Sequence, residues 1–264
     1  MRQNSKLFSA LPPIPHLYTP PLFTAKQLGG IKTFLGLRPD FVVSGVDLAT
    51  VKNLSGDELR GLVEFYLQRQ EDVFAGFKSA KRGAEWLAGR IAAKSAVLAL
   101  RPDIAAEYGW QVQIYTDAAG RPFCQLPGRA TEKMPDISIT HSGSIAAALA
   151  FSCLCGIDFQ KINPTVARVK SRFAIAAEQQ ILCENNYGLS ETALLTILWS
   201  VKEAVRKAFP RQPLPGFMQL QLQCFEARAG GFSGHLSCRR RDMPAAIPFF
   251  CIQLNDYAGA VVLR

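Results

Sequence analysis

The pattern of apolar and polar positions predicts well-defined elements from position 41 onward. Residues 41–48 (FVVSGVDL) indicate a strand that ends beside an acidic residue. Ser55 predicts the start of a helix, and residues 84–100 predict a long helix that stops before Pro102. Residues 1–40 are rich in proline and show no clear period. We therefore expect them to form an extended N-terminal segment on the outside of the core.

Helical and strand patterns are mixed in the rest of the chain. A turn signal at residues 117–120 follows a short strand, and Ser190 predicts the start of a helix that ends before Pro210. Several apolar runs have the length of strands: residues 112–115, 137–140, 146–151, 154–159, 219–227, 248–254 and 259–263. Because the two periods mix without a regular β–α alternation, the sequence predicts an α+β fold.

Two short patterns occur twice in the same order. Residues 45–47 (GVD) are matched by residues 156–158 (GID), each at the end of an apolar run. Residues 94–97 (KSAV) are matched by residues 202–205 (KEAV), each on a predicted helix. The aspartate-to-lysine separation is 47 positions in the first copy and 44 in the second. This ordered recurrence predicts an internal duplication.

A duplication would divide the chain into two similar α+β halves, residues 41–152 and residues 153–264. Such halves pack about a pseudo-twofold axis, which leaves a cleft where ligand sites tend to form. The superposition would place Asp47 on Asp158 and Ser95 on Glu203. Only the second half would then keep both acidic residues.

Composition limits the class of protein. The chain has 264 residues, 48% hydrophobic and 19% charged, which is typical of a globular protein. The longest apolar stretch, residues 144–159, contains Asp158 and is shorter than the roughly 20 residues of a membrane span. The N-terminus lacks an apolar signal core, and the seven cysteines form no C-x-x-C pair. We therefore expect a cytoplasmic protein with free thiols, and separately we expect a monomer.

A net charge of +9 favours an anionic partner. Nucleic acid, anionic lipid, a polyphosphate ligand and an acidic protein all satisfy it. The basic residues are scattered and are not interleaved with aromatic residues, which argues against a nucleic-acid-binding module. The sequence also lacks G-x-G-x-x-G, Walker A, H-E-x-x-H and G-x-S-x-G motifs.

The helix that contains residues 199–207 offers candidate chemistry. Glu203 and Lys207 lie four positions apart and project from the same face, which also fits an ordinary surface ion pair. Asp158 and Gln160, at the end of a predicted strand, add further oxygen atoms. Hard oxygen ligands with open positions suit Mg²⁺ that is shared with a phosphate.

The other basic residues allow two interpretations, contact with a phosphate or a solvated surface. His141 lies in the polar turn 140–143, where side chains and backbone N–H groups fit either a structural role or an anion. Both interpretations also remain open for Arg121 and for the cluster of Lys78, Lys81 and Arg82.

These motifs together resemble a known family. The sequence is similar to phosphopantetheinyl transferases of the surfactin-synthetase-activating type from Phe41 to the C-terminus. The resemblance rests on five segments: residues 82–96, Gly120-Arg121-Pro122, Thr140-His141-Ser142-Gly143, Gly156-Ile157-Asp158, and Trp199 to Ala204 with Lys207.

The resemblance implies a pseudodimer of two α+β halves, the 4'-phosphopantetheinyl transferase fold, with coenzyme A and Mg²⁺ in the cleft. It implies a holo-[acyl-carrier-protein] synthase type of reaction, which transfers phosphopantetheine from coenzyme A to a serine of an acidic acyl or peptidyl carrier protein and releases 3',5'-ADP. Nucleic acid and membrane are then excluded as partners.

The resemblance also implies roles for individual residues. The metal ligands would be Asp158, Gln160 and Glu203, and Glu203 would also be the base near the carrier serine. Lys202 and Lys207 would contact the pyrophosphate, and Lys207 would protonate the leaving group. The contacts to the 3'-phosphate region of coenzyme A would come from Lys78, Arg82, Arg121, Thr140 and His141.

Two positions depart from the family pattern. Gln160 stands where many relatives have a glutamate, and Arg121 replaces the usual lysine. Gln160 leaves one alternative open, a coenzyme A-binding protein with impaired catalysis. The positive charge leaves a second, a basic protein that binds nucleic acid.

Overall fold

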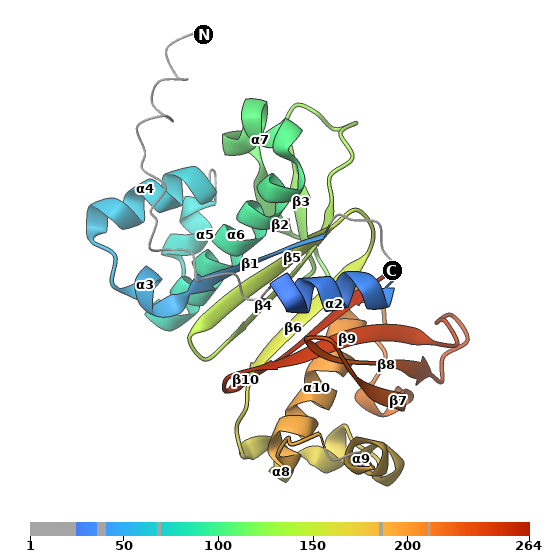
Figure 1. Cartoon of the computed structure of the whole chain (residues 1–264). Coiled ribbons are helices and arrows are strands. Elements are labelled where there is room, and N and C mark those ends of the chain that lie inside the picture. Colours follow the sequence, from blue (N-terminus) through green and yellow to red (C-terminus); the bar gives the residue numbers. More distant parts are fainter. Residues whose placement is uncertain (1–24, 36–40, 68–69, 185–186, 211) are drawn as a thin grey trace.

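We analysed a computed structural model of the chain (Figure 1). The structure describes residues 25–35, 41–67, 70–184, 187–210 and 212–264. Helices and strands are mixed without regular alternation, as an α+β fold requires. Within the described residues, no helix is both long enough and apolar enough to cross a membrane.

The first half is built on a three-stranded antiparallel sheet, whose strand order is β1-β5-β4. Its elements are β1 (Phe41–Asp47), α3 (Leu48–Lys52), α4 (Gly56–Tyr66), α5 (Glu71–Ala75), α6 (Ala80–Leu100), α7 (Pro102–Tyr108), a 3-10 turn (Gly109–Gln111), β2 (Gln113–Thr116), β3 (Pro122–Gln125), β4 (Asp136–Ser142) and β5 (Ile145–Phe151). Strands β2 and β3 form a separate hairpin. The long helix α6 packs on β1 and β5.

The second half is built on a five-stranded antiparallel sheet, whose strand order is β6-β10-β9-β8-β7. Its elements are β6 (Cys155–Lys161), α8 (Thr165–Arg168), a 3-10 turn (Lys170–Arg172), α9 (Ala176–Cys183), α10 (Glu191–Ala208), a 3-10 turn (Phe217–Gln219), β7 (Leu220–Arg228), β8 (Gly231–Cys238), β9 (Ile247–Leu254) and β10 (Tyr257–Leu263). The long helix α10 packs on β6 and β10.

The predicted helix starts are confirmed by capping contacts. The Ser55 hydroxyl accepts from the Glu58 backbone N–H, and the Ser190 hydroxyl accepts from the Ala193 backbone N–H. Helix α6 begins four positions earlier than the apolar pattern indicates, because Ser79 caps it through the Arg82 backbone N–H. The apolar pattern therefore marks the buried face, and the capping residue marks the true start.

The expectation of an extended segment over residues 1–40 is only partly testable. Residues 1–24 and 36–40 lie outside the described residues, but Ala25–Leu35 form a helix, α2, rather than extended chain. Helix α2 lies against β8 and β9, where Ile31 is fully buried (Figure 1). Glycine permits this close packing, because a Cβ atom on Gly30 would lie 2.2 Å from the Ala229 carbonyl oxygen.

Both halves follow the same chain path. A first strand (β1 or β6) is followed by helices, among them one long helix (α6 or α10) that covers the sheet. A later hairpin (β4–β5 or β9–β10) then returns so that its second strand pairs with the first strand of the half. This shared path is the connectivity that an internal duplication predicts.

The predicted superposition of Asp47 on Asp158 is wrong. Asp158 lies on the face of β6 that is turned towards α10, whereas Asp47 ends β1 and accepts from the Ala49 backbone N–H. Its neighbour Val46 packs in the α6 core, so Asp47 lies on the opposite face of its strand. When the two strands are superposed, their Gly-x-Asp patterns are therefore offset by an odd number of residues. Such an offset places equivalent side chains on opposite faces of the strand.

A third core lies between the two sheets. Besides the clusters under α6 and under α10, buried residues of β1 and β5 pack against those of β6, β9 and β10. The members include Phe41, Leu149, Ile157, Phe159, Phe250 and Val261. The halves are therefore joined by apolar packing as well as by the polar contacts described next.

Strands β4 and β6 meet side by side in parallel, although they belong to different sheets (Figure 1). Every second side chain of β4 accepts a hydrogen bond from every second backbone N–H of β6, at 2.8–3.2 Å. The pairs are Asp136 with Cys155, Ser138 with Ile157, Thr140 with Phe159, and Ser142 with Lys161. We call this series the β4–β6 seam. It sets how the halves face one another.

Candidate functional site

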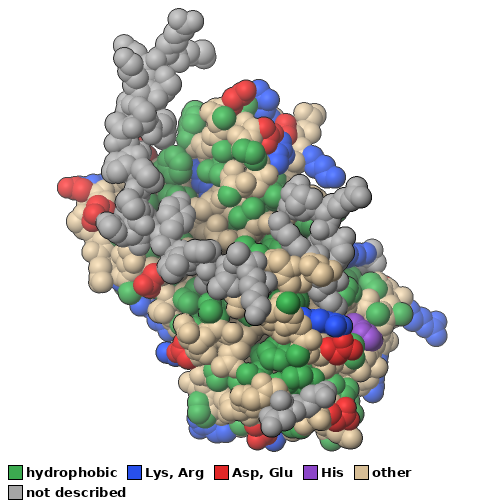
Figure 2. Space-filling model, in the orientation of Figure 1, with side chains coloured by type: hydrophobic (Ala, Val, Ile, Leu, Met, Phe, Trp, Pro, Cys, Tyr) green, Lys and Arg blue, Asp and Glu red, His purple; other side chains and the backbone are tan. Residues whose placement is uncertain are grey.

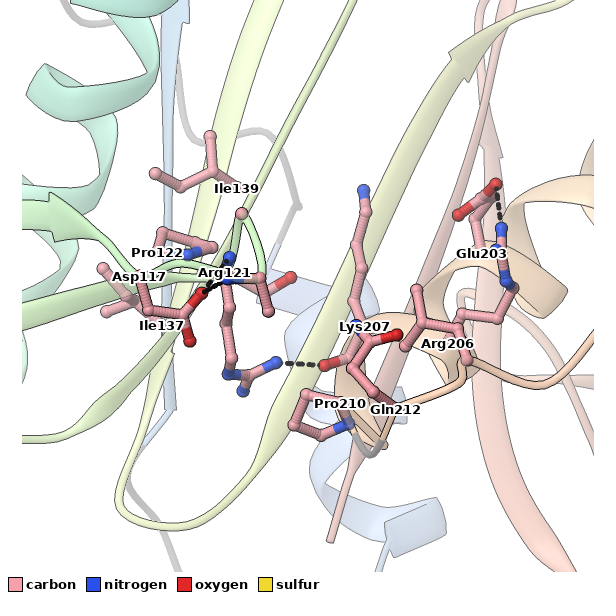
Figure 3. Close-up of a pocket in the computed structure, with 14 residues that line it drawn as sticks. Asp117, Arg121, Pro122, Ile137, Ile139, Glu203, Arg206, Lys207, Pro210 and Gln212 are labelled. Atoms are coloured by element: carbon pink, nitrogen blue, oxygen red, sulfur yellow. Dashed lines mark hydrogen bonds and ion pairs between the residues drawn. The ribbon is translucent and has the colours of Figure 1, made fainter.

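A cleft lies beside the β4–β6 seam and is lined by both halves (Figure 3). The first half contributes the β2–β3 turn, residues 117–122, and the middle of β4, residues 137–139. The second half contributes Glu203, Arg206 and Lys207 of α10 together with Pro210, Gln212 and Leu214. The cleft has a volume of ≈ 200 Å³ and is open to solvent. Ligand pockets typically occupy about 300–1,000 Å³, so this cleft can enclose only part of a larger ligand.

Strand β6 and helix α10 approach unusually closely at the second half's Gly-Ile-Asp pattern. A Cβ atom on Gly156 would lie 1.9 Å from the Ala204 carbonyl oxygen. Only glycine permits this approach, which brings Asp158 next to the C-terminal turns of α10. The glycine of the pattern therefore has a packing role that positions the aspartate.

Asp158 presents one free carboxylate oxygen. Its Oδ1 accepts from the Thr140 hydroxyl at 3.0 Å and from Lys207 Nζ at 2.9 Å. Its Oδ2 is buried and has no hydrogen-bond partner among the described residues. A buried unpaired carboxylate oxygen is costly, so the group is arranged for a cation or donor that completes it.

Glu203 lies on the last turns of α10, partly buried at the cleft. Burial raises the pKa of its carboxyl, and the nearby Asp158 charge raises it further, although Arg206 and Lys207 act in the opposite direction. Arg206 Nη1 lies 3.0 Å from Glu203 Oε1 (Figure 3). The Arg206 guanidinium also lies over the Phe217 ring. A carboxylate with a raised pKa is suited to accept a proton.

The oxygen atoms of the site fit a hard cation in part. Asp158 Oδ2 and Glu203 supply two carboxylates, but within the described ranges no three His, Cys, Asp or Glu side chains gather as a metal-binding group. Gln160 lies two positions further along β6, where its Oε1 accepts from the Ser142 hydroxyl at 3.0 Å. Two carboxylates with open positions match the way Mg²⁺ is held together with a phosphate.

The two lysines of the α10 motif have different environments. Lys207 Nζ donates to Asp158 Oδ1 and to the Ile157 carbonyl, and its side chain lines the cleft. Lys202 is fully buried on the opposite side of the helix, where its Nζ lies 2.7 Å from Glu178 Oε1. Lys202 therefore does not join the cleft residues, and its role is within the core.

Thr140 and Arg121 also make contacts within the protein. Thr140 is buried and bridges Asp158 and the Phe159 backbone N–H. The Arg121 guanidinium donates to Asp136 Oδ2 and to the Lys207 carbonyl oxygen. Both residues therefore hold other residues of the site in position.

The proposed phosphate contacts gather at the other end of β4. His141 is half exposed, and its Nδ1 lies 3.9 Å from Glu85 Oε2 on α6. Arg82, in the first turn of α6, and Lys78, just before this helix, are both exposed. The structure thus brings the start of α6 and His141 to one surface, with Glu85 between them.

Several residues of the site had no role in the sequence analysis. Asp136 and Arg206 contact Arg121 and Glu203 directly, and Asp117 orders the β2–β3 turn. Arg206 lies in the predicted helix that contains residues 199–207, and its position three residues after Glu203 is the sequence signal for this contact. The pairing of Asp136 with Arg121 depends on tertiary structure.

The class of protein is indicated by a comparison with family models. Residues 154–262 match the model described as the 4'-phosphopantetheinyl transferase superfamily. This segment spans β6 to β10 and includes Asp158, Glu203 and Lys207. A search of curated proteins gave no match.

Solved structures of acyl carrier protein synthases are similar to 42% of the chain. Holo-ACP-synthase from Plasmodium yoelii is 17% identical over 91% of its own length, with a TM-score of 0.35. Acyl carrier protein synthase of Mycobacterium tuberculosis is 24% identical over 93% of its length, with a TM-score of 0.30. Holo-[acyl-carrier-protein] synthase of Helicobacter pylori, in complex with coenzyme A, is 15% identical over 97% of its length, with a TM-score of 0.32.

Proposed function

We propose that the chain transfers the 4'-phosphopantetheine group of coenzyme A to a serine of an acyl or peptidyl carrier protein, releasing 3',5'-ADP. The observation that carries this proposal is the contact of Asp158 with Lys207 beside Glu203, in a segment that matches the superfamily, with Glu203 and Lys207 lining the cleft. The repeated chain path supports a pseudodimer of the surfactin-synthetase-activating type, with the ligand between the halves.

In this proposal Glu203 acts as the base. The serine hydroxyl attacks the phosphorus that carries pantetheine, and Glu203 takes up the hydroxyl proton. The bond between that phosphorus and the bridging oxygen breaks, so 3',5'-ADP leaves with the bridging oxygen.

Lys207 and Asp158 have complementary roles. Thr140 and Lys207 hold Asp158 Oδ1, so Oδ2 would be free to hold a Mg²⁺ ion together with Glu203 and with Gln160 or water. When bound, Mg²⁺ would neutralise charge on the pyrophosphate. Lys207 would stabilise the leaving 3',5'-ADP and supply its proton.

Charge and exposure support the proposed partners. Lys78 and Arg82 are exposed and His141 is half exposed, which suits contacts with the 3'-phosphate of coenzyme A. The net charge of +9 favours an acidic carrier protein. Lys and Arg side chains on the face shown in Figure 2 are scattered among Asp and Glu rather than joined in a stripe that would follow nucleic acid. All seven cysteines are free, which suits the reducing cytoplasm.

The direct test is formation of holo-carrier from apo-carrier, coenzyme A and Mg²⁺, measured as the gain in carrier mass. Glu203→Gln and Asp158→Asn preserve volume and remove charge, so each should lower kcat by about 100-fold or more. Glu191→Gln is the matched control, because Glu191 lies on the same helix but is exposed and paired with Lys170. Near-normal transfer by Glu203→Gln would refute the proposed site. Binding of coenzyme A without transfer by the wild type would favour the impaired binding protein.

A further inference from the structure

Arg121 is held rigidly in the turn between β2 and β3. Asp117 Oδ1 accepts from the backbone N–H groups of Ala119 and Arg121, both at 2.8 Å. Gly120 adopts a φ of +83°, which the turn requires and which side chains disfavour. The turn therefore fixes the direction in which the Arg121 side chain leaves the backbone.

The Arg121 guanidinium connects the two halves of the molecule (Figure 3). One of its nitrogens donates to Asp136 Oδ2 at the start of β4, in the same half. Another donates to the Lys207 carbonyl oxygen on α10, in the other half. Asp136 Oδ2 also accepts from the Cys155 backbone N–H at 2.8 Å, so both residues reach across the β4–β6 seam.

The contact with Lys207 has a particular consequence. The last carbonyl groups of a helix have no partner within the helix, and a cation stabilises them. Arg121 satisfies the carbonyl of the residue whose own side chain donates to Asp158. It thus fixes the backbone of Lys207 at the point where the Lys207 side chain enters the cleft.

We propose that Arg121 and Asp136 form a positioning pair that fixes the end of α10, and with it Lys207, against the first half. This inference rests on the proposed function only for its effect on turnover. In this role Arg121 acts through Lys207 and does not bind coenzyme A directly. Only a planar guanidinium makes both contacts, since a lysine ammonium lacks the fork geometry.

Arg101 offers a matched control. Its guanidinium also pairs with carboxylates, Asp103 and Glu132, and also donates to a backbone carbonyl, that of Lys133 at 2.9 Å. All of these partners lie in the first half, away from the cleft. Arg101→Ala therefore removes a comparable set of bonds without releasing α10.

The first experiment needs no activity. Hydrogen–deuterium exchange of the full chain should be about 10-fold faster in residues 203–209 of Arg121→Ala and of Arg121→Lys, and unchanged there in Arg101→Ala. In urea unfolding, Arg121→Ala and Asp136→Asn should be coupled by about 5-fold or more in the unfolding equilibrium constant. Unchanged exchange in this segment, or additive effects of the two variants, would overturn the pairing.

The second experiment separates positioning from ligand contact. Arg121→Ala, Arg121→Lys and Asp136→Asn should each lower kcat by about 10-fold or more, while KM for coenzyme A and the preference over dephospho-coenzyme A stay near wild type. A ligand contact predicts instead that KM rises, that the preference for coenzyme A is lost, that Arg121→Lys is nearly normal and that Asp136→Asn has no effect. That second pattern would overturn the inference.

The two proposals fail in distinguishable ways. If the wild type forms no holo-carrier, the proposed function is refuted, whereas the exchange and unfolding results still decide whether Arg121 and Asp136 hold α10. If transfer occurs but exchange in residues 203–209 does not change, the function stands and the positioning role is refuted.

Discussion

The two halves place a lysine at the same point of their long helix and bury it in the same way. Lys94 Nζ donates to the carbonyls of Phe65 and Trp110, at 2.7 and 3.0 Å. Lys202 Nζ donates to those of Phe173 and Phe217, at 2.6 and 3.2 Å. The first carbonyl lies 29 positions before the lysine in both halves. The lysine is thus part of the scaffold, and the next residue, Ser95 or Glu203, is where the halves diverge chemically.

The halves differ in how they neutralise this lysine. Lys202 pairs with Glu178, which is itself buried and accepts from the Leu222 backbone N–H at 2.8 Å. Within the described part of the chain, no carboxylate pairs with Lys94, and burial lowers its pKa to about 7. The same buried position therefore holds an amine with a carboxylate partner in one half and without a paired carboxylate in the other, and burial lowers the pKa of both amines, that of Lys94 to about 7.

The largest expected effect comes from removing the two lysines in turn. Lys202→Met leaves the Glu178 carboxylate buried without its cation, so it should lower the free energy of unfolding by about 3–5 kcal/mol. Lys94→Met leaves only two backbone carbonyls without their hydrogen-bond donor, so the free energy of unfolding should fall by about 1–3 kcal/mol. Urea unfolding at pH 7 measures both. Equal losses would break the distinction between the halves.

The second prediction uses pH. The pKa of Lys94 is about 7 in the folded chain and near its ordinary 10.5 in the unfolded chain, so between these values the unfolded chain holds more protons. Stability conferred by this position should therefore rise with pH above about 7, by up to about 1.4 kcal/mol per pH unit. The measurement is the difference in unfolding free energy between wild type and Lys94→Met from pH 6 to 9. The exposed Lys81→Met controls for loss of a lysine, and a difference that does not change with pH would contradict the assignment.

The smallest expected effect is that of restoring an acidic residue to the first half. Ser95→Glu copies Glu203 onto α6, but the facing strand β1 carries Val46 and Ser44 on its helix-facing side and no aspartate there. Without a second carboxylate the variant should gain no cation site. The change in the free energy of unfolding caused by Mg²⁺ should therefore agree between the variant and the wild type to within about 0.5 kcal/mol. A larger stabilisation by Mg²⁺ would mean that the first half retains a hidden site.

Much of the fold follows from periodicity. The strands at residues 41–47, 155–161 and 257–263 and the two long helices were predicted because their apolar faces are continuous. Strand β8 was missed because glycine, serine and histidine interrupt its pattern. The structure explains one interruption: a Cβ atom on Gly234 would lie 2.0 Å from the Cys224 carbonyl oxygen, so a poor strand former is required there.

The sequence predicts the part of the candidate site that lies within the second half. Asp158, Glu203 and Lys207 come together because a strand end and a helix turn of one half meet. Lys202 was expected at the ligand, yet it lies on the buried face of the same helix, since one step along a helix turns a side chain by about 100°. Arg121 and Asp136 needed the relative placement of the halves, which no local pattern encodes.

The β4–β6 seam has a consequence for solubility. Serine, threonine and aspartate oxygens of β4 occupy the N–H groups of β6 that point away from β10, so this sheet edge offers no template for a strand of another chain. The shield comes from the first half. Residues 154–262, produced alone, would contain β6 without β4, so we expect this fragment to associate edge to edge at lower concentrations than the full chain.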